Sequence, residues 1–154
     1  MKIAFTGHSH ILSSERIRKA VKEQINAHIA NEEKVTFYLG GYGDFDMLCA
    51  SVCREFKKER KGIELVYVAP YMSLSEQKKI KDMQSRGICD ASVYPPIEKT
   101  PPRYAIVKRN EWMMENSDLI IAYVERGYGG AYRALQAAKH KNKRTVNIYE
   151  CIKP

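Results

Sequence analysis

Short runs of strand-forming residues alternate with amphipathic, helix-like runs from one end of the sequence to the other. This alternation is typical of β-α-β units, in which helices join parallel strands and cover the sheet. The run 119–124 is apolar without alternation, which indicates a central strand covered on both faces. We predict an α/β fold with a mainly parallel central sheet, a three-layer sandwich whose strands cover residues 2–6, 35–39, 63–69, 91–94, 119–124 and 145–149.

The helix-like runs carry their own start signals and apolar stripes. The first helix is expected to begin near Ser13 or Ser14, and the third opens with Ser73 and Glu76 in a capping-box arrangement. The second places Cys49 and Cys53 on its apolar stripe, which predicts two buried thiols. The last helix has an alanine-rich face, formed by Ala131, Ala134, Leu135 and Ala138, which predicts close approach to the sheet.

Composition narrows the class of protein and of partner. With 154 residues, 44% hydrophobic and 29% charged, the chain is expected to form one globular domain spanning 1–154. The opening residues contain too few apolar positions for a signal peptide, and no run is long enough to cross a bilayer, so we expect a cytoplasmic location without a membrane partner. A net charge of +8 favours anionic partners. The basic clusters at 57–61, 78–81 and 139–144 suit either solvated helix ends or a nucleic-acid track.

Glycines gather in three loops that directly follow predicted strands. Seven of the nine glycines lie at 7–9, 40–46 and 127–131, and each of these loops leads into a helix. The carboxyl ends of parallel strands meet at one edge of a sheet, and the first turn of a helix offers unpaired N–H groups to an anion. The glycines either make tight turns only or form a shared phosphate-binding site in a Rossmann-like fold, and three such loops favour the site.

Two familiar nucleotide-binding motifs are missing from these loops. The pattern G-x-G-x-x-G would need glycine where Asp46 stands, and no G-K-S or G-K-T of a P-loop is present. We therefore do not expect a standard dinucleotide dehydrogenase or a P-loop NTPase. His8 and His10 form an H-x-H pair without a third ligand nearby, so no metal and no cofactor are expected.

Candidate ligand-binding residues come from these loops and the elements beside them. They are Gly7, His8, Ser9, Gly40, Gly41, Tyr42, Gly43, Asp44, Asp46, Tyr71, Arg109, Asn110, Gly129, Gly130 and Ala131. His8 is suited to donate to an anion or to orient its loop. Tyr42 and Tyr71, among the tyrosines near the predicted site edge, are the ones we expect to stack on a base, although tyrosine is also common at oligomer interfaces.

Several of these residues also have a purely structural interpretation. Either aspartate of the second loop, Asp44 or Asp46, would contact a ribose hydroxyl or cap the following helix. Asn110 lies on the apolar stripe of its helix, where its amide must find partners in loop backbone or in the ligand. Arg109 would pair with phosphate, or else form an ordinary ion pair with Glu111 or Asp118.

The order and spacing of these motifs resemble the SLOG superfamily. The similar elements are Gly7-His8-Ser9, Gly-Gly-x-Gly-x-x-Asp at 40–46, Arg109-Asn110 with Met113, Ser117-Asp118, and Gly129-Gly130-Ala131. The superfamily includes the Lonely Guy nucleotide phosphoribohydrolases, the Rossmann-like domain of DprA, and stand-alone domains that sense nucleotide-derived signals. The resemblance implies that the loops at Gly40 and Gly129 contact phosphate and that Arg109 lies at the floor of the site.

One departure from that pattern bears on activity. Aligned on Gly129-Gly130, the glutamate of the phosphoribohydrolase motif is replaced by Gln136. Cleavage of an N-glycosidic bond develops positive charge that a carboxylate stabilises and a neutral glutamine does not. Glu111, Glu125 or Asp46 would have to substitute, so binding without turnover is favoured.

Three functions remain in play. The first is a sensor, carrier or sequestering protein that binds a nucleotide-derived small molecule of the ADP-ribose or cyclic-nucleotide class, acting alone, through a partner or as a homo-oligomer (dimer or tetramer). The second is an enzyme, a nucleotide N-glycosidase (phosphoribohydrolase) or a deoxyribosyltransferase-like protein. The third is binding of single-stranded nucleic acid, for which the net charge of +8 is the main support.

Overall fold

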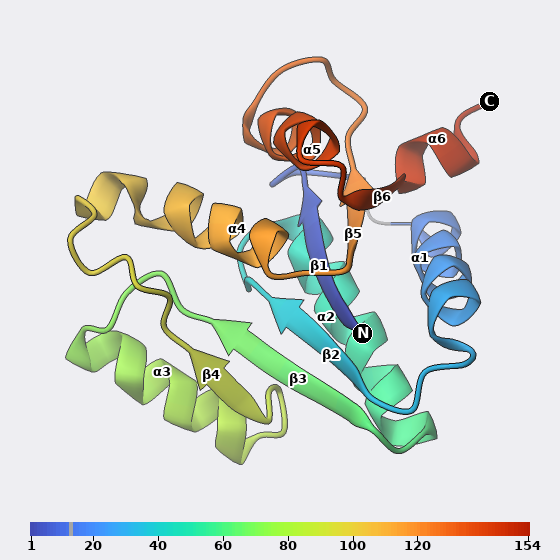
Figure 1. The fold of residues 1–154 in the computed structure, drawn as a ribbon. Coiled ribbons are helices and arrows are strands. Elements are labelled where there is room, and N and C mark those ends of the chain that lie inside the picture. Colours follow the sequence, from blue (N-terminus) through green and yellow to red (C-terminus); the bar gives the residue numbers. More distant parts are fainter. Residues whose placement is uncertain (13) are drawn as a thin grey trace.

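A computed structural model describes residues 1–12 and 14–154 of the chain (Figure 1). Six strands form one sheet in the order β4-β3-β2-β1-β5-β6, and every neighbouring pair is parallel. The strands are β1 (Lys2–Gly7), β2 (Val35–Leu39), β3 (Ile63–Val68), β4 (Ala91–Val93), β5 (Leu119–Tyr123) and β6 (Arg144–Asn147). The helices are α1 (Glu15–Ile29), α2 (Asp44–Glu59), α3 (Leu74–Ser85), η1 (Pro102–Tyr104), α4 (Ala105–Glu115), α5 (Gly130–His140) and α6 (Ile148–Ile152). The fold is Rossmann-like, as predicted.

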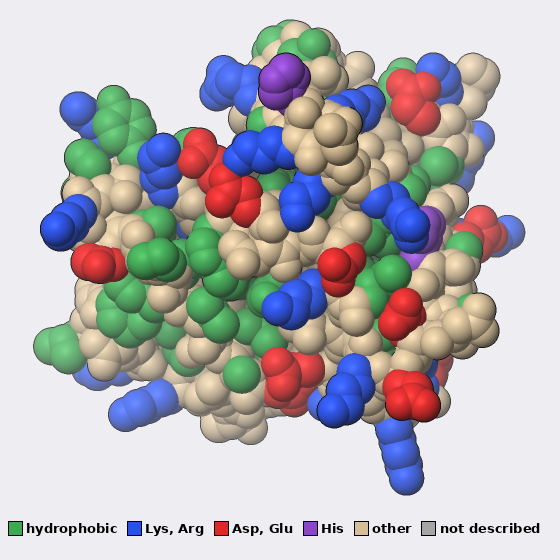
Figure 2. Space-filling model, in the orientation of Figure 1, with side chains coloured by type: hydrophobic (Ala, Val, Ile, Leu, Met, Phe, Trp, Pro, Cys, Tyr) green, Lys and Arg blue, Asp and Glu red, His purple; other side chains and the backbone are tan. Residues whose placement is uncertain are grey.

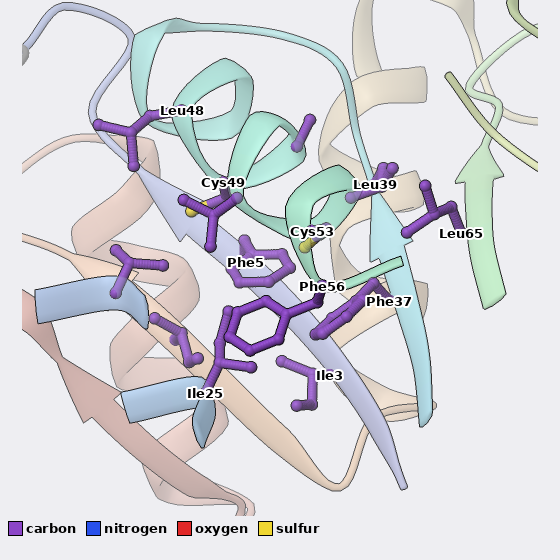
Figure 3. Close-up of a cluster of buried hydrophobic side chains, with 14 of the residues drawn as sticks. Ile3, Phe5, Ile25, Phe37, Leu39, Leu48, Cys49, Cys53, Phe56 and Leu65 are labelled. Carbon is purple, nitrogen blue, oxygen red and sulfur yellow. The ribbon is translucent and has the colours of Figure 1, made fainter. Parts of the chain in front are cut away.

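The helices cover the two faces of the sheet as separate layers. Alternate side chains of β1, β2, β3 and β5 pack on one face against α1 and α2, and this layer forms the larger core. Figure 3 shows the rings of Phe37 and Phe56 between strand and helix, where their centroids lie 6.3 Å apart. Cys49 and Cys53 are fully buried in the same core, which confirms the prediction for both thiols.

The opposite face is covered by α4 and α5, where the buried apolar clusters are smaller. Met113 and Met114 from α4 and Ala138 from α5 pack there on Ala4 and Ile120 of the central strands. Ala131 and Ala134 were predicted to bring α5 close to the sheet. Both are only half-buried and line a cavity, although Ala131 also packs against the cluster of Ala122, Val124 and Leu135. Leu135 and Ala138 are buried against the sheet, so the predicted close approach is confirmed for these two residues.

The start of α1 agrees with its predicted signal, and the start of α3 agrees in part. Ser14 Oγ accepts a hydrogen bond from the backbone N–H of Ile17, while Ser13 lies outside the described residues. Ser73 Oγ accepts from the backbone N–H of Glu76, which is the first half of a capping box. The carboxylate of Glu76 instead accepts from the hydroxyl of Tyr67 at 2.6 Å, so a tertiary contact replaces the second half.

The last predicted strand ends earlier than expected. It was predicted over 145–149, but β6 ends at Asn147 and the next residues form the short helix α6. The Asn147 side chain exchanges hydrogen bonds with the backbone of Val124, and its Oδ1 also accepts from the N–H of Tyr149. This single side chain therefore caps α6 and hydrogen-bonds the end of β5.

Over the described residues, the structure contains no helix with the length and apolarity needed to cross a bilayer.

Candidate functional site

The order of the strands reverses next to β1, and a cavity lies at that point. The chain builds β1 to β4 outward on one side, then returns so that β5 pairs with the free edge of β1. In open parallel sheets such a reversal separates the loops at the carboxyl edge and leaves a crevice for a ligand. Here a cavity of about 460 Å³ is lined by residues 5–9 of β1 and its loop together with parts of α4 and α5.

The structure brings nine of the fifteen candidate residues into the lining of this cavity. They are Gly7, His8, Ser9, Tyr42, Asp46, Arg109, Asn110, Gly130 and Ala131. All three glycine loops are thus represented at one edge of the sheet. The remaining candidates, which are Gly40, Gly41, Gly43, Asp44, Tyr71 and Gly129, are not part of the lining.

His8 is held between two hydrogen-bond donors at the end of β1. The residue is 3% exposed, and its Nε2 atom lies 3.0 Å from the backbone nitrogen of Glu125. Because a backbone N–H only donates, Nε2 must accept, and a neutral imidazole then carries its proton on Nδ1. Burial lowers the pKa of His8, and the neighbouring Arg126 lowers it further while Glu125 raises it, so the ring is neutral near pH 7.

The proton on His8 Nδ1 faces a second donor. Arg126 Nη2 lies 3.1 Å from Nδ1, and a guanidinium nitrogen has no lone pair to accept with. Both side chains line the cavity, so two donors lie side by side at its carboxyl-edge end. An anion that accepts from both would remove this conflict. Arg126 was not among the predicted site residues. Its position between a buried strand and a glycine loop is the feature of the sequence that could have identified it.

Arg109 is completely buried, and its hydrogen bonds hold the backbone of two neighbouring strand ends. Its Nη1 donates to the carbonyl of Gly40 at 3.0 Å and to that of Val68 at 2.7 Å, and its Nε donates to Asn110 Oδ1 at 2.9 Å. Neither predicted ion pair is formed, since Glu111 pairs with Lys108 and the Asp118 carboxylate accepts from the backbone N–H of Lys2. Arg109 therefore supports the floor of the cavity by joining α4 to β2 and β3.

Asp46 lies beside this buried guanidinium. Gly40 permits the close approach, since a Cβ there would be 3.0 Å from Asp46 Oδ2 and 3.3 Å from Arg109 Nη2. Burial raises the pKa of Asp46 to about 7, although Arg109 and the backbone of Tyr42 both act to lower it. The site thus contains a carboxyl group that changes its charge near neutral pH.

Tyr42 covers Arg109 from the outside. Its ring lies 5.3 Å from the Arg109 guanidinium carbon and 4.8 Å from Lys79 Nζ, distances at which a cation is attracted to an aromatic face. Tyr71, the other tyrosine expected to stack on a base, instead donates to the carbonyl of Pro102 at 3.4 Å and lies outside the lining.

The two aspartates of the second loop do not cap α2. Gly43 occupies the N-cap position, and no side-chain cap bond is formed there among the described residues. Asp44 Oδ2 instead accepts from the backbone N–H of Ile11 at 3.1 Å, and the Asp44 N–H donates to the carbonyl of Ser9. Asp44 thus ties the first loop, whose Ser9 lines the cavity, to α2 without lining the cavity itself.

Comparison with known proteins finds similarity in fold but not in sequence family. No protein-family model matches the sequence, and the curated proteins give no match. The fold is similar to the X-ray structure of DNA processing protein A (DprA) from Streptococcus pneumoniae, with a TM-score of 0.61 and 16% identity over 94% of this chain and 48% of that one. DprA from Helicobacter pylori, described for its single-stranded DNA binding mode, matches with a TM-score of 0.49 and 14% identity over 90% of this chain and 62% of that one. The chain thus spans about half of the pneumococcal protein and less than two thirds of the other, and the likeness concerns the Rossmann-like fold.

Proposed function

We propose that the protein binds a phosphorylated, nucleotide-type small molecule in the cavity at the carboxyl edge of the sheet, without turning it over. The supporting observation is the pair of donors at His8 Nδ1 and Arg126 Nη2, 3.1 Å apart. A phosphate oxygen accepting from both satisfies the imidazole proton and gains charge-assisted hydrogen bonds from the guanidinium. The amino end of α5 at Gly130, which also lines the cavity, adds backbone N–H groups and a partial positive charge.

Gln136 supports binding over hydrolysis, although two of the carboxylates that would have to substitute for a glutamate there, Asp46 and Glu111, line the cavity. Gln136, at the position of the glutamate in the phosphoribohydrolase motif, is exposed and lies outside the cavity lining. The volume of about 460 Å³ falls within the range of small-molecule sites. A nucleotide-sized ligand therefore fits the cavity, and the protein serves as its sensor, carrier or sequestering partner.

The test is calorimetry with nucleoside 5′-monophosphates and ADP-ribose, each compared with its unphosphorylated nucleoside. Arg126→Gln is expected to weaken binding of the phosphorylated ligands about ten- to a hundred-fold, the effect of losing a charge-assisted hydrogen bond, and to leave nucleoside binding unchanged. Arg86→Gln is the matched control, because Arg86 lies at the end of α3 and pairs with Asp82 there. Equal affinity of the unmodified protein for nucleotides and nucleosides would refute the proposal, and release of free base would replace binding with hydrolysis.

Single-stranded nucleic acid is the second candidate ligand. It is supported by the net charge of +8 and by the fold shared with a DNA processing protein. The placement of the charges favours it less. On the face shown in Figure 2 basic side chains are interspersed with acidic ones, and members of the predicted clusters are engaged locally, as Lys57 is with Asp90 and Lys141 with Glu115.

Salt dependence separates the two candidates. Binding of oligothymidylate that weakens steeply with salt, is not displaced by a mononucleotide and is unaffected by Arg126→Gln would support the nucleic-acid function. Displacement of the oligonucleotide by the mononucleotide would place both in the cavity and support the first proposal.

A further inference from the structure

The cavity continues beyond the carboxyl edge and runs between α4 and α5 over the face of the sheet. On one side it is lined by Ala131, Ala134 and Ala138 of α5 and by Lys141, the residue that caps this helix, and on the other by Ile106, Asn110 and Met114 of α4. Residues spaced by three or four lie on one side of a helix, so each set follows its helix for about two turns or more. The two sets form the walls of a slot, and we refer to these seven residues as the α4–α5 slot.

Five of the seven residues of the α4–α5 slot are apolar, and the two walls differ in side-chain size. The α5 side offers alanine methyl groups, whereas the α4 side offers the longer Ile106 and Met114. The small side chains of Ala131 and Ala134 leave room beside Ile106 and Asn110, all four of which are half-buried. Further along the slot, Ala138 and Met114 are buried and belong to the cluster that packs on the sheet, so they close it below. A flat, mostly apolar group that enters between the helices would bury both of its faces against them.

Asn110 supplies a polar contact halfway along the slot. Its Oδ1 accepts from Arg109 Nε at 2.9 Å, which fixes the orientation of the amide because the guanidinium can only donate. Within residues 1–12 and 14–154 the structure gives Asn110 Nδ2 no hydrogen bond. Its N–H groups are thus available to an acceptor on the occupant, such as a ring nitrogen or carbonyl of a nucleobase.

The far end of the slot is spanned by an ion pair. Lys141 at the end of α5 pairs with Glu115 at the end of α4, and both residues line the cavity. Lys143 Nζ also donates to the backbone carbonyls of Glu115 and Ser117. The slot is therefore joined across at this end, while the end near His8 and Arg126 carries the donor pair.

We infer that the α4–α5 slot is the base-binding subsite, and that the ligand is a nucleotide with a terminal base whose phosphate lies at His8 and Arg126. This rests on the function proposed above and names the class of ligand more narrowly. The base lies between the two helices, with Asn110 Nδ2 donating to it, and not on the outer face of Tyr42. A base that enters a slot spanned at its far end must be at the end of its molecule or turned out of a strand.

The experiment fills the slot and leaves the phosphate end unchanged. Ala134→Leu places a larger side chain in the wall, and Gln136→Leu is the matched control on the exposed side of the same helix. AMP, GMP, UMP and ribose 5-phosphate are the probes, measured by calorimetry and by the ¹⁵N chemical shifts of the His8 ring. Ala134→Leu is expected to weaken nucleotide binding at least about ten-fold without altering ribose 5-phosphate binding, while Gln136→Leu alters neither.

The outcomes separate failure of the subsite from failure of the proposed function. If Ala134→Leu melts like the unmodified protein and still binds nucleotides equally well, the base lies elsewhere although the phosphate site stands. If neither nucleotides nor ribose 5-phosphate bind to the unmodified protein or shift His8, the proposed function itself is wrong. Should Ala134→Leu not fold, Ala137→Met gives the same test, because Ala137 lines the cavity at an exposed position where a longer side chain is accommodated.

Discussion

The carboxyl group of Asp46 links the charge of the site to pH. In the unfolded chain an aspartate ionises near its ordinary pKa of about 3.9, whereas in the folded protein burial raises the pKa of Asp46 to about 7. Between these values the unfolded state releases a proton that the folded state keeps. The contribution of Asp46 to stability therefore falls as the pH rises from about 4 to about 7 and is level above that range.

Asp46→Asn removes this dependence. The free energy of unfolding of the variant, relative to the unmodified protein, should increase between pH 4.5 and pH 7.5, by at most about 4 kcal/mol for a pKa change of this size. Urea unfolding of both proteins across the pH range is the measurement. A difference between the two proteins that stays constant with pH would show that Asp46 titrates as an ordinary carboxylate.

Arg109 carries a prediction about stability. Arg109→Met keeps most of the side-chain volume but leaves the carbonyls of Gly40 and Val68 without their buried donor. We expect a loss of about 2 to 5 kcal/mol in the free energy of unfolding, measured by urea titration. Arg103→Met, at an exposed position in η1, should change stability little. Unchanged stability in Arg109→Met would mean that these hydrogen bonds contribute nothing, and Arg109 would return to the phosphate site.

At the scale of elements, two adjacent glycines at the start of α5 have different roles. Gly129 is the N-cap residue with φ +96°, a conformation that side chains rarely adopt, whereas Gly130 is the first helical residue. Within the described part of the chain, a Cβ at either position meets no atom closer than 4 Å. The difference between them is therefore one of backbone conformation alone.

Alanine substitutions at the two positions should have opposite signs. Gly129→Ala is expected to lower the free energy of unfolding by about 1 to 2 kcal/mol, while Gly130→Ala should raise it by up to about 1 kcal/mol. Thermal unfolding of the two variants is the check, and each serves as the control for the other. Equal effects would mean that the loop relaxes to a conformation that alanine tolerates.

The sequence predicted these elements well where the signal is local. Three features depend only on neighbouring residues in the chain, and all three are found as predicted. They are the glycine loops that follow β1, β2 and β5, the N-cap of α3 at Ser73, and the apolar run that forms β5. The prediction failed where a distant group decides the outcome. Asn147 ends β6 because Val124 lies beside it, and the Glu76 carboxylate contacts Tyr67 in place of its own helix end. The slot was missed for the same reason, since alanines on α5 do not reveal how far α4 stands from them.

On the scale of the whole molecule, β1 lies at the centre of the sheet between β2 and β5. Ile3 to Gly7 pair with Leu119 to Tyr123, and the backbone N–H of Lys2 donates to the Asp118 carboxylate across 116 positions of sequence. Because a long loop must close before this pairing stabilises anything, a polypeptide that ends at residue 116 should not form a stable sheet. Circular dichroism and amide hydrogen exchange on that polypeptide test this, and native-like protection of β1 would contradict it.

The same placement of β1 determines how long this strand must wait for its partner β5 during synthesis of the chain. At about 5 to 20 residues per second, roughly 6 to 23 s pass between translation of Lys2 and of Asp118. Throughout that interval one edge of β1 has no strand beside it, and a strand edge without a neighbour readily pairs with other chains. Expression at lower temperature changes both the rate of synthesis and the strength of pairing between the free edge of β1 and other chains. The yield of folded protein should therefore depend on how long the ribosome takes to deliver β5.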